Sequence, residues 1–180
     1  MRILKENSLC LVIDIQEKLF PYIFENEILI NNVNKLIEGL KIFDVPVIVT
    51  EQYKKGLGAT VSAISGNLKD DSIFEKMSFS CCDDEPILNE LKKRNKKNII
   101  VCGIESHICV LQTTIDLVEQ GFQPIVVADC VSSRKLTDKL IALDRAKQEG
   151  AIITTYESLL FELCRYAGSD SFKTLAKIIK

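Results

Sequence analysis

Three side chains that could together carry out nucleophilic catalysis stand far apart in this sequence: Asp14, Lys76 and Cys109. A cysteine thiolate attacks carbonyl carbon atoms, and a carboxylate can accept the thiol proton and return it to a leaving group. An ammonium group stabilises the negative charge that develops during such a reaction. These residue types allow covalent hydrolysis without a histidine base, provided that the fold brings the three side chains together.

Cys109 follows a segment that predicts a strand, a sharp turn and a helix. The apolar run Asn98–Cys102 is typical of a buried parallel strand, Gly103 permits a sharp exit, and Ser106 can cap a helix that continues to Gln120. Cys109 would then lie in the first helical turn, where backbone N–H groups and the helix dipole favour an anion. We therefore expect its thiolate to form more easily than that of a free thiol, with a structural buried thiol as the alternative.

Asp14 and Lys76 are expected at the same edge of a sheet as Cys109. Leu9–Ile15 is a continuous apolar strand that carries Asp14 near its carboxyl end, and Ser72–Phe79 alternates like a short strand that carries Lys76. Open parallel sheets bind their ligands beyond the carboxyl ends of the strands. From the residues alone, a turn-forming aspartate and an exposed strand lysine remain alternative interpretations.

Strands and helices alternate along the whole chain. This order predicts an α/β fold of three layers, a doubly wound and mainly parallel sheet of six strands with helices on both faces. No repeat, linker or low-complexity tract indicates a second domain, so residues 1–180 are expected to form one domain. The further strands are expected at Val45–Thr50, Gln123–Ala128 and Ala151–Thr155, and the further helices at Glu27–Phe43, Asp84–Arg94, Thr137–Glu149, Glu157–Tyr166 and Ser171–Ile179.

Composition narrows the class of protein. The chain has 180 residues, 47% of them hydrophobic, with a net charge of −2, and its densest basic run, Lys92–Lys97, is interpreted as a solvated helix end. We expect no nucleic-acid partner and no membrane span. The seven cysteines form no disulfide framework, and Met1–Ser8 is too short for a signal peptide, which together favour the cytoplasm.

Three motifs resemble the isochorismatase-like cysteine hydrolases, and the resemblance runs along essentially the whole chain. Leu11–Gln16 (LVIDIQ) resembles the aspartate strand of that family, Lys76 its lysine, and Gly103–Val110 (GIESHICV) its nucleophile turn. Finer matches resemble the isochorismatase domain-containing protein subgroup: Thr50–Tyr53 (TEQY), Asp129–Arg134 (DCVSSR) and the chain end from Phe172 to Lys180.

The resemblance implies a site and an activity. Cys109 would be the nucleophile, Asp14 the general base and acid, and Lys76 the electrostatic stabiliser, in the hydrolysis of a small amide-type C–N substrate through a thioester. A non-proline cis peptide bond between Ile104 and Glu105 would orient the N–H groups of Glu105 and Cys109 as an oxyanion hole. The resemblance also suggests a homo-oligomer.

Two comparisons with branches of the family narrow the range of reactions that we expect. The metal-binding nicotinamidase branch carries an aspartate and histidines beside its pocket, whereas this chain has Glu51–Tyr53 there and a single histidine, His107. We therefore expect no metal ion or other cofactor, and we interpret His107 as a surface or interface residue. Members that hydrolyse isochorismate itself lack the cysteine in the nucleophile turn, so vinyl-ether hydrolysis is not expected.

Other residues near the reactive positions are candidates for substrate binding. Gln16 could hold Asp14 or the substrate, and Arg134 could bind a substrate carboxylate or pair with an acidic side chain, of which we favour the pair. A scaffold protein that keeps the hydrolase fold is the alternative function, and a thiol redox sensor lacks an obvious resolving cysteine. The expected pocket wall, for which a plain core role is equally consistent, comprises Phe20, Tyr53 and Phe79.

Overall fold

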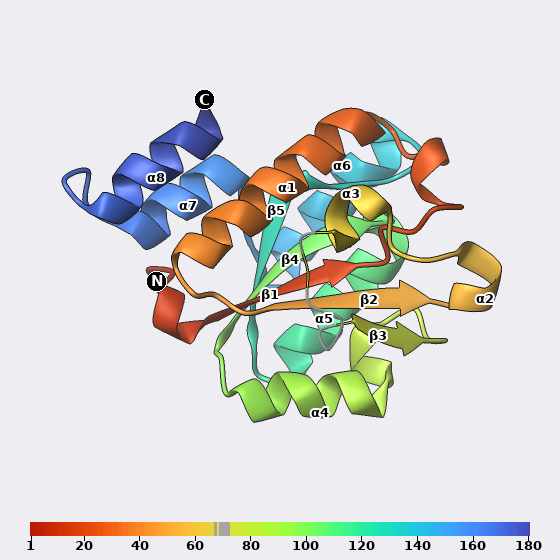
Figure 1. The fold of residues 1–180 in the computed structure, drawn as a ribbon. Coiled ribbons are helices and arrows are strands. Elements are labelled where there is room, and N and C mark those ends of the chain that lie inside the picture. The colour runs from red at the N-terminus through yellow and green to blue at the C-terminus, as the bar shows by residue number, and fades with distance from the viewer. Residues whose placement is uncertain (67, 69–72) are drawn as a thin grey trace.

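The computed structural model, which describes residues 1–66, 68 and 73–180, contains one six-stranded parallel sheet (Figure 1). Its strand order is β3-β2-β1-β4-β5-β6, so the first strand along the chain lies near the middle of the sheet. Every neighbouring pair of strands is parallel, as the alternation of strands and helices predicted. The strands are β1 (Ser8–Ile13), β2 (Val47–Gln52), β3 (Ile73–Lys76), β4 (Asn98–Ile104), β5 (Gln123–Ser132) and β6 (Ile152–Thr154).

Helices cover both faces of the sheet, which confirms the three-layer prediction. Residues 10 and 12 of β1 pack toward α1, α7 and α8, whereas residues 9, 11 and 13 pack toward α4, α5 and α6 (Figure 1). No helix of the described residues is long and apolar enough to span a bilayer. The helices are α1 (Asn26–Ile42), α2 (Lys54–Leu57), α3 (Ser62–Ser65), α4 (Glu85–Arg94), α5 (Leu111–Glu119), α6 (Leu136–Gln148), α7 (Tyr156–Cys164) and α8 (Asp170–Ile179).

The register of the central strands brings the ends of β1, β2 and β4 together. Ile13 pairs with Thr50 of β2 on one side and with Gly103 of β4 on the other. Gly103 has a φ of +135°, and a Cβ atom there would lie 2.2 Å from the carbonyl oxygen of Ile13. Glycine is therefore required at this position, because any side chain would push β4 away from Ile13, the last residue of β1.

The structure differs from the predicted elements mainly where strands end. β5 continues through Asp129 to Ser132, with a register shift against β4 between Val101 and Gly103, so Asp129 lies inside the strand instead of at its end. The short helices α2 and α3 between β2 and β3 were not predicted. Ser72, which the sequence placed at the start of β3, lies outside the described residues.

Candidate active site

Asp14 directly follows β1 and is completely buried. Its backbone adopts a left-handed conformation with a φ of 52°, and its N–H group donates to the carbonyl oxygen of Thr50 at 3.1 Å. The hydroxyl of Thr50 donates to Asp14 Oδ1 at 2.7 Å, and Lys76 Nζ donates to Oδ2 at 2.7 Å. Both carboxylate oxygens are therefore fixed by donors from β2 and β3, the two strands beside β1 on that side of the sheet.

Lys76 is the last residue of β3, and its ammonium group is buried. Besides Asp14, it donates to the carbonyl oxygens of Ser78 at 2.9 Å and Phe79 at 3.1 Å. Burial is the largest single effect and lowers the pKa of Lys76, but the charge of Asp14, its hydrogen bond and the nearby thiols of Cys81 and Cys109 together outweigh it, so the pKa is raised above its usual range. The lysine therefore stays charged, with three acceptors arranged around its ammonium group.

Cys109 lies in η5 (Ser106–Val110), a single π-helical turn that joins β4 to α5, and its side chain is buried. Its thiol donates to Gln52 Oε1 at 3.7 Å. Burial raises the pKa of Cys109 well above the range of a free thiol, and the charge of Asp14 and a hydrogen bond to it raise the pKa further, whereas Lys76 lowers it. The three expected side chains thus meet around the sulfur atom.

The direction of the pKa shift corrects the expectation that the turn would favour a thiolate. The prediction from the segment considered the N–H groups and dipole of the first helical turn but not the loss of water around Cys109 or the carboxylate of Asp14 beside it. These two effects outweigh the influence of the helical turn, so Cys109 is a neutral thiol before the reaction. Ser106 also forms no side-chain cap, and its buried hydroxyl has no hydrogen-bond partner among the described residues.

The turn before Cys109 contains the cis peptide bond between Ile104 and Glu105 that the family resemblance implied. The carbonyl oxygen of Glu105 accepts the N–H group of Ile108 at 3.0 Å. The Glu105 carboxylate binds Arg134 through two hydrogen bonds, at 2.8 Å from Nε and 3.2 Å from Nη2. Arg134 therefore pairs with an acidic side chain, as favoured from the sequence, and this pair fastens the turn to the segment after β5.

Gln16 uses its carboxamide to hold the backbone around the end of β2. Its Nε2 donates to the carbonyl oxygens of Gln52 at 3.0 Å and Gly58 at 2.7 Å, and its Oε1 accepts the N–H group of Gln52 at 2.8 Å. The side chain is fully buried. The structure therefore shows Gln16 bonded to backbone instead of to the Asp14 carboxylate.

The three aromatic residues expected at the pocket differ in their surroundings. Tyr53 is 46% exposed and Phe79 is 54% exposed. Each contacts Lys76 through its backbone: the Tyr53 N–H group donates to the Lys76 carbonyl, and Lys76 Nζ donates to the Phe79 carbonyl. Phe20 is half-buried and packs against the core under α1. Tyr53 and Phe79 therefore flank the lysine, whereas Phe20 contributes to the core.

Sequence reasoning missed three residues of this cluster: Thr50, Gln52 and Cys81. Thr50 and Gln52 belong to the TEQY segment, and the pairing of Thr50 with Ile13 is the signal that could have assigned Thr50 to Asp14. Cys81 is buried, and its thiol donates to the Thr50 hydroxyl at 3.9 Å. Burial raises the pKa of Cys81 to about 11, so this second sulfur is also a neutral thiol.

His107 does not belong to the cluster around the sulfur. Its Nδ1 lies 2.9 Å from the hydroxyl of Ser133, and its side chain is partly exposed. Within residues 1–66, 68 and 73–180, no three histidine, cysteine, aspartate or glutamate side chains are grouped so that they could hold a metal ion.

Curated relatives match nearly the whole chain. Isochorismatase family protein 1B of Dictyostelium discoideum is 41% identical over 184 residues, which cover 99% of this chain and 89% of the relative. Isochorismatase domain-containing protein 2A of Mus musculus is 38% identical over 181 residues, which cover 99% of this chain and 85% of the relative.

Solved structures of similar proteins have the same fold. The Mar1 ribonuclease of Caenorhabditis elegans superposes with a TM-score of 0.93 at 42% identity, covering 99% of this chain and 92% of that one. The YcaC gene product of Escherichia coli, described as an octameric hydrolase of unknown specificity, has a TM-score of 0.93 at 26% identity, with 99% and 90% of the two chains covered. The Isochorismatase domain matches residues 8–158, and the chain therefore belongs to the isochorismatase family.

Proposed function

We propose that this family hydrolase cleaves the C–N bond of a small amide-type substrate through a thioester on Cys109. The observation that carries the proposal is the buried contact of one carboxylate, Asp14, with both an ammonium group and a thiol. Burying a carboxylate costs desolvation free energy, which the paired ammonium group offsets. A buried charge pair beside the proposed nucleophile is typical of a functional site.

The raised pKa of Cys109 determines the first step. Because the resting thiol is neutral, Asp14 accepts its proton while the sulfur attacks the carbonyl carbon of the substrate. The carbonyl oxygen becomes negatively charged, and the backbone N–H groups of Glu105 and Cys109 are proposed to donate to it. Lys76, whose Nζ lies 2.7 Å from Asp14 Oδ2, holds this carboxylate in place and balances its negative charge.

The same carboxylate completes the cycle. Asp14 returns its proton to the nitrogen of the leaving amine when the C–N bond breaks, which leaves an acyl group on the sulfur. Water then attacks the thioester with Asp14 as the base, and the acid product and the thiol are released. Gln52, whose Oε1 accepts from the thiol at 3.7 Å, helps to orient the sulfur before attack.

The surroundings support a small molecule as the substrate. Tyr53 and Phe79, which are half-exposed and contact Lys76 through their backbones, are proposed to form the pocket wall, whereas Gln16 supports the loop at Gly58. We also propose that residues 1–180 act as one hydrolase domain within a homo-oligomer, which the octameric E. coli hydrolase supports.

Ribonucleolytic activity is a second candidate because the C. elegans protein at 42% identity is named a ribonuclease. RNA binding requires cationic groups that follow the phosphates to the reactive site. The densest basic run, 92–97, lies before β4 and thus at the edge of the sheet opposite Cys109, which follows β4. This separation favours the small amide over RNA.

The test compares Cys109→Ala with the wild type on a panel of small primary amides and ureido acids, with released ammonia as the readout. We expect turnover in the wild type, none in Cys109→Ala, and unchanged turnover in the matched control Cys164→Ala, whose thiol lies on α7 away from the cluster. Mass spectrometry of the quenched wild-type enzyme should detect an acyl group on the peptide that contains Cys109.

Three outcomes would contradict the proposal. Amide hydrolysis that persists in Cys109→Ala would show that the sulfur is not the nucleophile. Cleavage of an RNA probe that Cys109→Ala abolishes, with no amide turned over, would favour the ribonuclease, and inactivity on both together with no acyl adduct would favour the scaffold alternative.

A further inference from the structure

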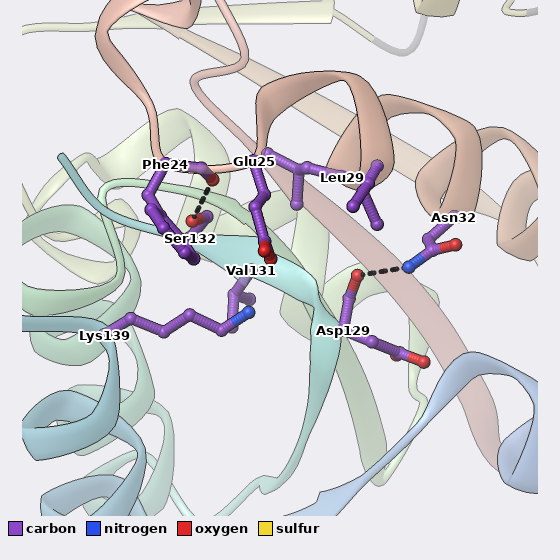
Figure 2. Close-up of a pocket in the computed structure, with 9 residues that line it drawn as sticks. Phe24, Glu25, Leu29, Asn32, Asp129, Val131, Ser132 and Lys139 are labelled. Carbon is purple, nitrogen blue, oxygen red and sulfur yellow. Dashed lines mark hydrogen bonds between the residues drawn. The ribbon is translucent and has the colours of Figure 1, made fainter. Parts of the chain in front are cut away.

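A cavity of about 90 Å³ lies between the start of α1, the end of β5 and the side of α6 (Figure 2). None of Asp14, Lys76 and Cys109 lines it, so it is separate from the candidate active site. Its floor is firmly held, since the Ser132 hydroxyl donates to the Phe24 carbonyl at 2.8 Å. The lining residues are Phe24, Glu25, Ile28, Leu29, Asn32, Asp129, Val131, Ser132 and Lys139.

Two opposite charges face this cavity without pairing. Figure 2 shows the side chain of Lys139 extending past Val131 toward Glu25. Lys139 is half-buried, yet within the described part of the chain its ammonium group forms no hydrogen bond or ion pair. Glu25 precedes α1 in a left-handed conformation, but its carboxylate neither caps the helix nor bonds to another described residue.

The surroundings of Lys139 confirm that its charge is poorly compensated. Burial lowers the pKa of Lys139, although the charges of Glu25 and Asp129 act in the opposite direction. Asp129 cannot move freely to pair with it, because its Oδ1 accepts the N–H group of Tyr156 at 2.9 Å and its carbonyl accepts from Asn32 at 2.9 Å. The ammonium group therefore has three donors available to a bound molecule.

The volume limits the size of that molecule. One water-sized site occupies roughly 10–15 Å³ on this measure, so about 90 Å³ holds on the order of six to nine non-hydrogen atoms. A ligand with a single charge pairs with only one of the two side chains. An anion on Lys139 would be repelled by Glu25, and a cation on Glu25 would be repelled by Lys139. A ligand that carries both charges on a short carbon chain matches both sides at once.

We propose that this cavity binds a small zwitterion of the amino-acid type, with its carboxylate on Lys139 and its ammonium group on Glu25. The backbone carbonyl of Asp129 and the carboxamide of Asn32 lie on the same wall and supply further polar contacts. This inference does not depend on the proposed amide hydrolysis, because no residue is shared between the two sites.

The experiment is an NMR titration of the full chain with glycine and L-alanine, following the amide signals of residues 24–32 and 129–132. Methylammonium and acetate, each of which carries one of the two charges, are the comparison probes. We expect the amino acids to shift these signals with a dissociation constant of about 1 mM or lower, and each single-charge probe to bind about tenfold more weakly or worse.

Variants assign the binding to the two charges. Lys139→Met and Glu25→Gln should each weaken binding by about tenfold or more, because each removes one charged hydrogen bond. Lys147→Met on the same helix and Glu27→Gln in the first turn of α1 are exposed controls and should leave binding unchanged. No saturable shift with either amino acid, equal binding of methylammonium, or binding that both charge variants leave intact would overturn the proposal.

Discussion

Replacing Lys76 by methionine deletes the ammonium group that lies 2.7 Å from the Asp14 carboxylate and that also serves two backbone carbonyls. The side chains of Lys76 and Asp14 are both fully buried, so water cannot take the place of the lost partner. Removing one member of a buried ion pair costs about 3–5 kcal/mol, because the other charge stays behind uncompensated. For a chain of this length we expect the melting temperature to fall by about 6–20 °C.

Urea unfolding of the wild type and Lys76→Met measures this cost, with Lys93→Met as the matched control. Lys93 is 79% exposed and pairs with Glu90 at 3.7 Å, so its loss should change stability by no more than about 1 kcal/mol. Adding Asp14→Asn to Lys76→Met removes the stranded charge and should restore part of the loss.

The Lys76–Asp14 pair also determines how the stability of the wild type changes at alkaline pH. The pKa of Lys76 is raised in the folded protein, so its contribution to stability is complete below its unfolded pKa and is lost as the pH rises through the folded value. A Lys76→Met protein within about 1 kcal/mol of the wild type, or a double variant no more stable than Lys76→Met, would refute this account of the buried pair.

Three shorter predictions concern the groups around the sulfur. Thr50→Val deletes the donor 2.7 Å from Asp14 Oδ1 and should cost about 1.5–3 kcal/mol in urea unfolding, whereas Thr50→Ser should cost much less. Since the pKa of Cys109 is raised, its alkylation by iodoacetamide, followed by peptide mass spectrometry, should be slower at neutral pH than that of free cysteine and accelerate with increasing pH; a faster rate would contradict the geometry. Arg134→Met, which frees Glu105, should reduce kcat/KM with a stability change below about 1 kcal/mol, since Arg134 is largely exposed; an unchanged kcat/KM would remove the pair from the mechanism.

The arrangement of the site could be predicted because it depends on topology. Two continuous apolar strands and one short alternating strand predict Asp14, Lys76 and Cys109 at one edge of a parallel sheet, and the structure brings the three side chains together there. Their catalytic roles stay a prediction. The longer helices α1 and α4–α8 were also predictable to within a few residues, because each buries an apolar stripe in the core, whereas the four-residue helices α2 and α3 were not predicted.

Features that depend on register and burial could not be predicted from a single segment. The extension of β5 through Asp129 results from a shift in pairing with β4, which local periodicity does not encode. The pKa of Cys109 was predicted in the wrong direction because desolvation and a carboxylate 95 positions earlier in the chain outweigh the local turn. The bonds of Gln16 likewise depend on a distant loop, which closes over it at Gly58.

The ammonium group of Lys76 couples an exposed border of the sheet to its interior. β3 is a four-residue edge strand, and edge strands are where local opening is least costly. Fraying of β3 that moves the carbonyls of Ser78 and Phe79 should also weaken the contact with Asp14, because Lys76 Nζ donates to all three groups. The rate of hydrogen exchange at β3 would then report how often the contact between Lys76 and the buried carboxylate of Asp14 is intact.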